Sequence, residues 1–275
     1  MNNLFNYLDR PSPIHRLTGA TRLVCLLLWS FAAMSTYDTR FLLFLSVMAL
    51  VLFRLSRIRL RDVSFMLGFT AVFMVLNNLL VFVFSPEHGV SLYGTRHALF
   101  PIPANLALTG EQLFSHLNLI LKYFATIPIV LLFVCTTNPS EFAASLNRIG
   151  VPYTIAMSVA LALRYIPDIQ REYHEISQAQ QARGLEMSRK QSLVRRLKAA
   201  AGILIPLILS SMDRIETISN AMQLRAFGKG KKRTWYMARP FTRWDFLSIA
   251  LCALLLVLAL LLNVLNGGRF WNPFR

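Results

Sequence analysis

Long runs of apolar residues alternate with basic or mixed segments along this chain of 275 residues. An α-helix rises 1.5 Å per residue, so roughly 20 apolar residues cross the hydrocarbon core of a membrane. Five runs reach or approach that length, at 23–37, 41–53, 64–84, 113–135 and 244–265. The first two are short and lie close together, which favours a tight hairpin of tilted or partly buried helices. The pattern therefore predicts an all-α, polytopic membrane protein with about five transmembrane helices.

Lys and Arg are distributed unevenly between the segments that join these runs. The loop after the second run carries four Arg residues within 54–61, whereas the segment 85–112 carries only Arg96. Because cytoplasmic loops are enriched in Lys and Arg, we expect the first loop in the cytoplasm and the second segment outside. Counting helices from these loops places the N-terminus in the cytoplasm and the tail after residue 265 outside.

The segment 140–243 holds most of the basic residues, 17 of the 29 Lys and Arg, but only 7 of the 13 Asp and Glu. Clustered Lys and Arg can mark a nucleic-acid interface. Here the predicted cytoplasmic position and contact with lipid headgroups account for the net charge of +16, so we expect a lipid membrane as a partner and no nucleic acid. We predict three regions: a membrane region over 1–137, a cytoplasmic helical domain over 138–243, and a final span with an external tail over 244–275.

Two long amphipathic helices are predicted in the cytoplasmic domain. The first follows Pro167, which kinks or restarts an apolar helix that begins near Pro152, and it ends at Gly184. The second runs over about 191–227 and is bent by Pro206. Apolar residues at helical spacing form a stripe on each helix. The stripes consist of Ile169, Tyr173 and Ile176 on the first helix, and Leu209, Met212, Ile215, Ile218 and Met222 on the second.

Patterns typical of catalysis or cofactor binding are missing from the sequence. The apolar runs lack paired carboxylates, and His88, His97 and His116 have spacings that match no common metal site. The basic stretch 228–234 has neither the spacing nor the preceding strand of a phosphate-binding loop. We expect no catalytic residue, metal site or cofactor in this chain. The alternatives, a membrane-embedded enzyme or a stand-alone secondary carrier, would need converging catalytic residues or a coupling-ion site.

Polar residues inside the apolar runs have two interpretations each, because charge within a membrane is costly and often functional. Lys122 either takes part in function or extends along its own helix to the interface. The pair Asn77 and Asn78 either contacts a substrate or forms hydrogen bonds between helices. The sequence favours neither interpretation of Lys122, and it favours the interhelical bonds for the Asn pair.

Two helix ends in the cytoplasmic domain share a local pattern, a single Arg between small or apolar residues with Gly close behind. They are Ala182-Arg183-Gly184 and Leu224-Arg225-Ala226, the second followed by Gly228. Each Arg could complement the helix dipole while Gly ends the helix. Alternatively, each end docks on a partner, since Arg offers five donors and small neighbours allow close approach. Two such ends in one domain favour docking points for a pair of partners.

These segments resemble the transmembrane T component of energy-coupling factor (ECF) type ABC transporters, ATP-driven importers of vitamins or transition-metal ions in prokaryotic cell membranes. The resemblance covers nearly the whole chain and is strongest over 136–228. It rests on Ile14-His15-Arg16-Leu17, Thr136-Thr137-Asn138-Pro139, Gly150-Val151-Pro152, Arg164-Tyr165-Ile166-Pro167 and the two helix ends.

In that family two Ala-Arg-Gly signatures each contact one of two ATPase subunits, and a small S component binds the substrate. The resemblance implies that Ala182, Arg183 and Gly184 form the first signature. In the second only Arg225 matches, since Leu224 and Ala226 replace Ala and Gly. A non-catalytic coupling subunit is implied, with ATP and Mg bound by the partner ATPases. Contacts with the S component are expected along the two stripes, at Ile169, Tyr173, Ile176, Leu209, Met212, Ile215 and Met222.

Overall fold

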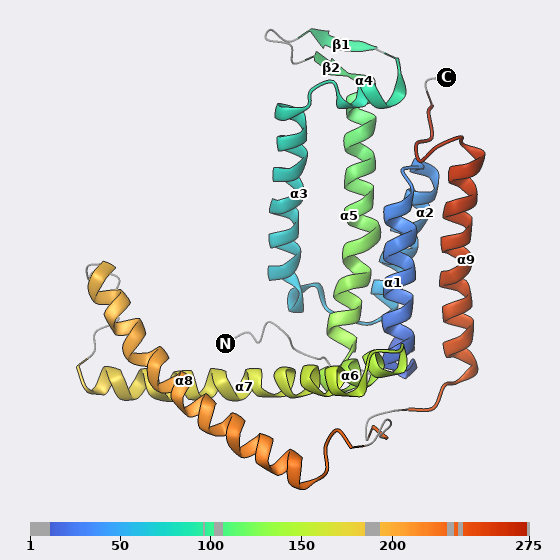
Figure 1. The fold of residues 1–275 in the computed structure, drawn as a ribbon. Coiled ribbons are helices and arrows are strands. Elements are labelled where there is room, and N and C mark those ends of the chain that lie inside the picture. The colour runs from blue at the N-terminus through green and yellow to red at the C-terminus, as the bar shows by residue number, and fades with distance from the viewer. Residues whose placement is uncertain are drawn as a thin grey trace. The chain divides into compact units, whose positions relative to one another are not determined.

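The computed structural model describes residues 12–95, 97–101, 107–184, 193–229, 234–235 and 239–273 (Figure 1). Its helices are α1 (Gly19–Ser35), α2 (Thr39–Leu55), α3 (Ser64–Phe84), α4 (His88–Tyr93), α5 (Gly110–Thr136), α6 (Pro139–Arg148), α7 (Tyr153–Ala182), α8 (Leu193–Leu224) and α9 (Arg243–Leu265). Two short strands, β1 (Ala98–Pro101) and β2 (Ala107–Thr109), form an antiparallel hairpin. The all-α prediction is confirmed, and the hairpin is an addition that the sequence pattern did not indicate.

The chain divides into two compact units, one formed by Met1–Asn138 with Arg239–Arg275 and the other by Pro139–Ala238. In the first unit α5 packs on α1 and α2, while α9 packs on the other side of α1 (Figure 1). Small residues allow these helices to approach closely, because Ala33, Ala49, Ala125 and Ala259 are fully buried. The indole of Trp29 donates a hydrogen bond of 2.8 Å to the carbonyl of Ala125.

Three helices within the described residues, α3, α5 and α9, are long and apolar enough to cross a membrane. The bounds of α3 match the predicted run, and α9 begins one residue before it. Helices α1 and α2 have 17 residues each, the lower limit for a span. Both begin before their apolar runs, because Thr18 and Asp38 cap them with side-chain oxygens. The chain is therefore a multi-pass membrane protein whose two shortest spans are partly covered by protein.

Two buried charged residues join α1 to its neighbours. The guanidinium of Arg22 donates to the carbonyl oxygens of Thr136, at the end of α5, and of Leu17. The carboxylate of Asp245 accepts a hydrogen bond of 2.8 Å from the backbone of Thr18 and closes a capping box at the start of α9 with Thr242. Buried charge is tolerated when such bonds satisfy it, so these residues fix the ends of three helices against one another.

The polar residues inside the predicted spans form local contacts within the first unit. The ammonium of Lys122 lies 3.2 Å from the centre of the Tyr37 ring, at the turn between α1 and α2. This position agrees with a side chain that extends along its helix to the end of the bundle. The amide oxygen of Asn78 lies 3.0 Å from Nδ1 of His116. The bond joins α3 to α5, which agrees with interhelical hydrogen bonding.

In the second unit α6 packs on α7, and α7 and α8 cross each other (Figure 1). The sequence left open whether Pro167 kinks the helix or restarts it. The second alternative is wrong, because α7 continues through Pro167 without a break. The face of α8 that meets α7 contains Ala199, Ile203 and Leu207, all buried. These residues differ from the stripe that the sequence pattern singled out, so α8 has two distinct apolar faces.

Candidate functional site

The C-terminal end of α7 is closed by a left-handed glycine. The backbone N–H of Arg183 donates to the carbonyl oxygens of Ala179 and Gln180, which makes Arg183 the C-cap. Gly184 has φ +87°, and its N–H donates to Gln181 over 3.0 Å. Left-handed backbone at this position favours glycine, which has no Cβ to clash. The helix therefore stops sharply, and Ala182, Arg183 and Gly184 are all exposed.

The C-terminal end of α8 repeats this geometry with a different residue. The N–H of Arg225 donates to Ala221 over 3.2 Å, and the N–H of Ala226 donates to Gln223 over 2.9 Å. Phe227 completes a Schellman motif by donating to Met222 over 2.9 Å. Ala226 has φ +53°, the conformation that Gly184 takes in α7. The second end thus has the backbone form of the first although alanine stands where glycine is expected.

The left-handed conformation of Ala226 gives the first prediction. We expect Ala226→Gly to stabilise this end by about 1 kcal/mol, because a Cβ at positive φ is unfavourable. Amide hydrogen exchange of Phe227 should slow by about fivefold, since its N–H closes the motif. The control Ala221→Gly makes the same change at an exposed helical position and should speed exchange. Exchange that is equally fast or faster in Ala226→Gly would refute the strained cap.

The two arginines and the residues directly before them are exposed, so a partner could contact them. Arg183 and Arg225 both lie at the surface. Leu224, which replaces the alanine of the first end, is 89% exposed. Leu224 therefore leaves an apolar side chain uncovered beside Arg225. Each end can therefore offer a fork of hydrogen-bond donors beside a small or apolar neighbour.

An aromatic cluster holds the end of α8 against the corner between α6 and α7. The ring of Tyr153 lies 5.7 Å from that of Phe227 and 5.4 Å from that of Trp235, measured between centroids. The indole of Trp235 donates to the side-chain oxygen of Asn147 over 3.1 Å, and Asn147 donates to the carbonyl of Val151. The sequence pattern did not indicate this cluster, because its members are isolated aromatics far apart in the chain.

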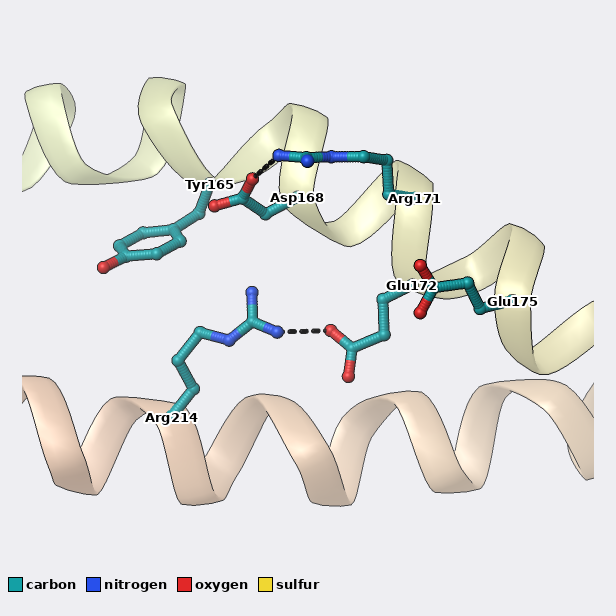
Figure 2. A pocket seen from close by; sticks show the side chains of 6 residues that line it. All are labelled: Tyr165, Asp168, Arg171, Glu172, Glu175 and Arg214. Atoms are coloured by element: carbon teal, nitrogen blue, oxygen red, sulfur yellow. Dashed lines mark hydrogen bonds and ion pairs between the residues drawn. The ribbon is translucent and has the colours of Figure 1, made fainter.

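A polar hollow lies where α7 and α8 cross (Figure 2). Its volume is about 420 Å³, and its lining consists of Tyr165, Asp168, Arg171, Glu172, Glu175 and Arg214. The Glu172 carboxylate accepts a hydrogen bond from the Ser210 hydroxyl and forms a 2.7 Å ion pair with Arg214. We call Glu172, Ser210 and Arg214 the crossing cluster. The sequence pattern did not indicate this cluster, because charges on amphipathic helices usually face solvent.

The predicted stripes lie on exposed surfaces of the second unit. Leu209, Met212 and Ile215 are 58%, 60% and 65% exposed, on the face of α8 turned away from α7. Leu204, Ile205 and Ile208 extend this face and were not predicted. On α7, Ile169 and Tyr173 are exposed, while Ile176 is half-buried, as is Met222 on α8. A contiguous exposed apolar face of this kind is typical of a protein or membrane interaction surface.

Two of the histidines considered for a metal site, His97 and His116, form hydrogen bonds with different partners. His97 pairs with Glu111 over 2.7 Å, and His116 bridges Asn78 and Gln112. Within the part of the chain that the structure describes, no three His, Cys, Asp or Glu side chains come together as metal ligands. The arrangement of His97 and His116 serves to join loops and helices of the first unit.

Comparison with known proteins gives a family match. The sequence profile of CbiQ, described as cobalt transport protein, matches residues 10–236. A protein of Listeria innocua is 30% identical over 278 residues, covering 98% of this chain and 97% of its own. Proteins of Exiguobacterium sibiricum and Thermanaerovibrio acidaminovorans are 28% and 30% identical, covering 96% and 88% of this chain and 96% and 87% of theirs. All three are named energy-coupling factor transporter transmembrane protein EcfT.

Proposed function

Because this chain belongs to the CbiQ family of energy-coupling factor transporter transmembrane proteins, we propose that it couples ATP hydrolysis to import. In this proposal it joins two cytoplasmic ABC-type ATPase subunits to a small membrane S component that binds a vitamin or a transition-metal ion. The observation that carries the proposal is the matched pair of helix ends, each with an exposed Arg at the C-cap and a left-handed residue behind it.

Each helix end would engage one ATPase subunit. The guanidinium groups of Arg183 and Arg225 would donate to carboxylates or carbonyls in a groove of the partner. The left-handed residue behind each Arg ends the helix at that point, so each Arg lies at an exposed helix end that could enter a groove. Closure of the ATPase pair on ATP would then displace the two ends, and α7 and α8 would transmit that movement.

The S component would rest on the exposed apolar face of α8 and the stripe of α7. Leu209 and Ile215 present branched apolar side chains, and Met212 presents an unbranched thioether; none of them carries a charge. Methionine adapts its shape to a moving partner, and non-directional apolar contacts allow rocking and release. In this proposal substrate specificity belongs to the S component and not to this chain.

The proposed orientation places the second unit and the N-terminus in the cytoplasm of a prokaryotic cell. The basic residues of 140–243 and of the 54–61 loop support it through the positive-inside rule. In this arrangement ATP and Mg are bound by the partner ATPases, and this chain serves as a non-catalytic subunit without a cofactor of its own.

Purification of the tagged chain from its native host tests this function. We expect two ATPase subunits, identical or different, and at least one small membrane protein to accompany it in a mild detergent. Mass spectrometry identifies the companions, and an unrelated tagged membrane protein from the same host is the control. A chain that purifies alone and shows substrate turnover or transport by itself would support an enzyme or a carrier instead.

A further inference from the structure

Helices α7 and α8 contact each other through buried apolar side chains and through polar bonds that have a fixed direction. Ala199, Ile203 and Leu207 pack on α7 through non-directional contacts, which resist sliding weakly. A hydrogen bond of 3.2 Å runs from the side-chain amide of Gln180 to the carbonyl of Gly202. The charged link lies further along, at the crossing cluster (Figure 2). Together with the Gln180–Gly202 bond, this charged link limits the crossing angle of the two helices.

Both carboxylate oxygens of Glu172 are engaged by residues one turn apart on α8. Oε1 accepts from the Ser210 hydroxyl, and Oε2 lies 2.7 Å from Nη2 of Arg214. The guanidinium of Arg214 also lies 5.9 Å from the centre of the Tyr165 ring on α7. A carboxylate held at two points resists both translation and rotation of one helix on the other. The Glu172 and Arg214 side chains are 17% and 34% exposed, so solvent screens the pair only in part.

The crossing cluster lies at equal distances along the two helices from the two docking ends. Arg183 follows Glu172 by eleven positions, and Arg225 follows Arg214 by eleven positions. At 1.5 Å per residue both ends are about 16 Å along the helix from the cluster, so a rotation of about 10° there moves each end by about 3 Å. A shift of that size exceeds the tolerance of a hydrogen bond. The cluster is therefore placed to set the relative position of both ends.

We propose that Glu172, Ser210 and Arg214 are positioning residues that fix the crossing of α7 and α8 and so hold Arg183 and Arg225 in register for two partners. The inference rests on the proposed coupling function for its consequence, but its structural part concerns this chain alone. Loss of the link leaves both helices folded and their ends intact. The Gln180–Gly202 bond and the Tyr153–Phe227 contact remain, but the distance between the ends varies more than in the parent chain. ATP-driven movement at one end is then transmitted inefficiently to the other.

Spin-label distances in the purified chain test the structural part. Labels on Ala179→Cys and Ala221→Cys, both exposed, report the separation near the two ends after Cys25, Cys135 and Cys252 are replaced by alanine. We expect a narrow distribution in the parent chain and a clearly broader one in Glu172→Gln and Arg214→Met. Ser210→Ala, a milder change, gives an intermediate width. Combining Glu172→Arg with Arg214→Glu narrows the distribution again.

Glu175→Gln is the matched control, because it neutralises a carboxylate in the same hollow and on the same helix. Within the described part of the chain, Glu175 forms no hydrogen bond or ion pair, and Figure 2 shows its carboxylate apart from Arg214. The distribution of spin-label distances in Glu175→Gln should stay as narrow as that of the parent chain. Equal widths in Glu172→Gln and the parent, or equal broadening in Glu175→Gln, would overturn the proposal.

Transport in the assembled complex tests the consequence. We expect Glu172→Gln and Arg214→Met to assemble with the ATPases and hydrolyse ATP, but to import about tenfold less substrate per ATP, with recovery in the charge-swapped pair. If the parent chain neither assembles with ATPases nor supports ATP-dependent import, the coupling function fails. If the parent couples and both variants couple equally well, the positioning role fails and the coupling function stands.

Discussion

Replacing Arg183 or Arg225 by glutamate is expected to reduce ATP-dependent import by about a hundredfold or more, because reversing a desolvated charge at an interface costs several kcal/mol. The two helix ends have matching backbone geometry, so each single change should disable one docking point and the double change should add little. Import is measured in proteoliposomes, with the vitamin or metal ion that the co-purified S component binds.

Two controls separate loss of docking from general damage. Arg183→Lys keeps the charge but loses the planar fork of donors, so an intermediate loss is expected. Arg171→Glu reverses an exposed charge on the same helix. Arg171 pairs with Asp168 three residues away, and surface pairs of this kind contribute little. Wild-type assembly and import in both single variants and the double variant would remove Arg183 and Arg225 from the mechanism.

Introducing charge on the exposed face of α8 should detach the S component while the ATPases remain bound. In Met212→Glu with Ile215→Glu, two carboxylates would be buried without partners against an apolar surface, and we expect about a hundredfold weaker capture. The yield of S component per ATPase after purification measures the effect. Asn220→Glu adds charge at an exposed position further along α8, beyond Met212 and Ile215, and it should leave the ratio unchanged. Normal capture by the double variant would place the S component elsewhere.

The spans were predictable because membrane crossing imposes a length and a composition on each helix. The apolar run 64–84 gives the bounds of α3, and 244–265 gives those of α9 within one residue. Helices α1 and α2 begin before the predicted runs. Their N-caps, Thr18 and Asp38, are polar residues that a count of apolar residues leaves out. The β1–β2 hairpin lies in a loop where no alternation of apolar and polar residues marks a strand.

The candidate site was predictable only where local sequence determines local geometry. Arg183 followed by Gly184 indicates a helix end, since glycine favours the left-handed cap. Ala226 gives no such signal, and its conformation accompanies the Schellman hydrogen bond of Phe227, whose ring packs near Tyr153. The crossing cluster depends on residues about forty positions apart that only the packing of α7 on α8 brings together. Local rules are overridden at such tertiary contacts.

Site-specific photocrosslinking tests the central claim, that two helix ends of one chain dock on ATPase subunits. A photoreactive residue replaces Ala182 in one variant and Leu224 in another, since both are exposed neighbours of the arginines. After irradiation of native membranes, mass spectrometry should identify an ABC-type ATPase on the chain from both positions and none from the control position Asn220. Capture of no ATPase at either helix end, in membranes that contain the intact chain, would contradict the account.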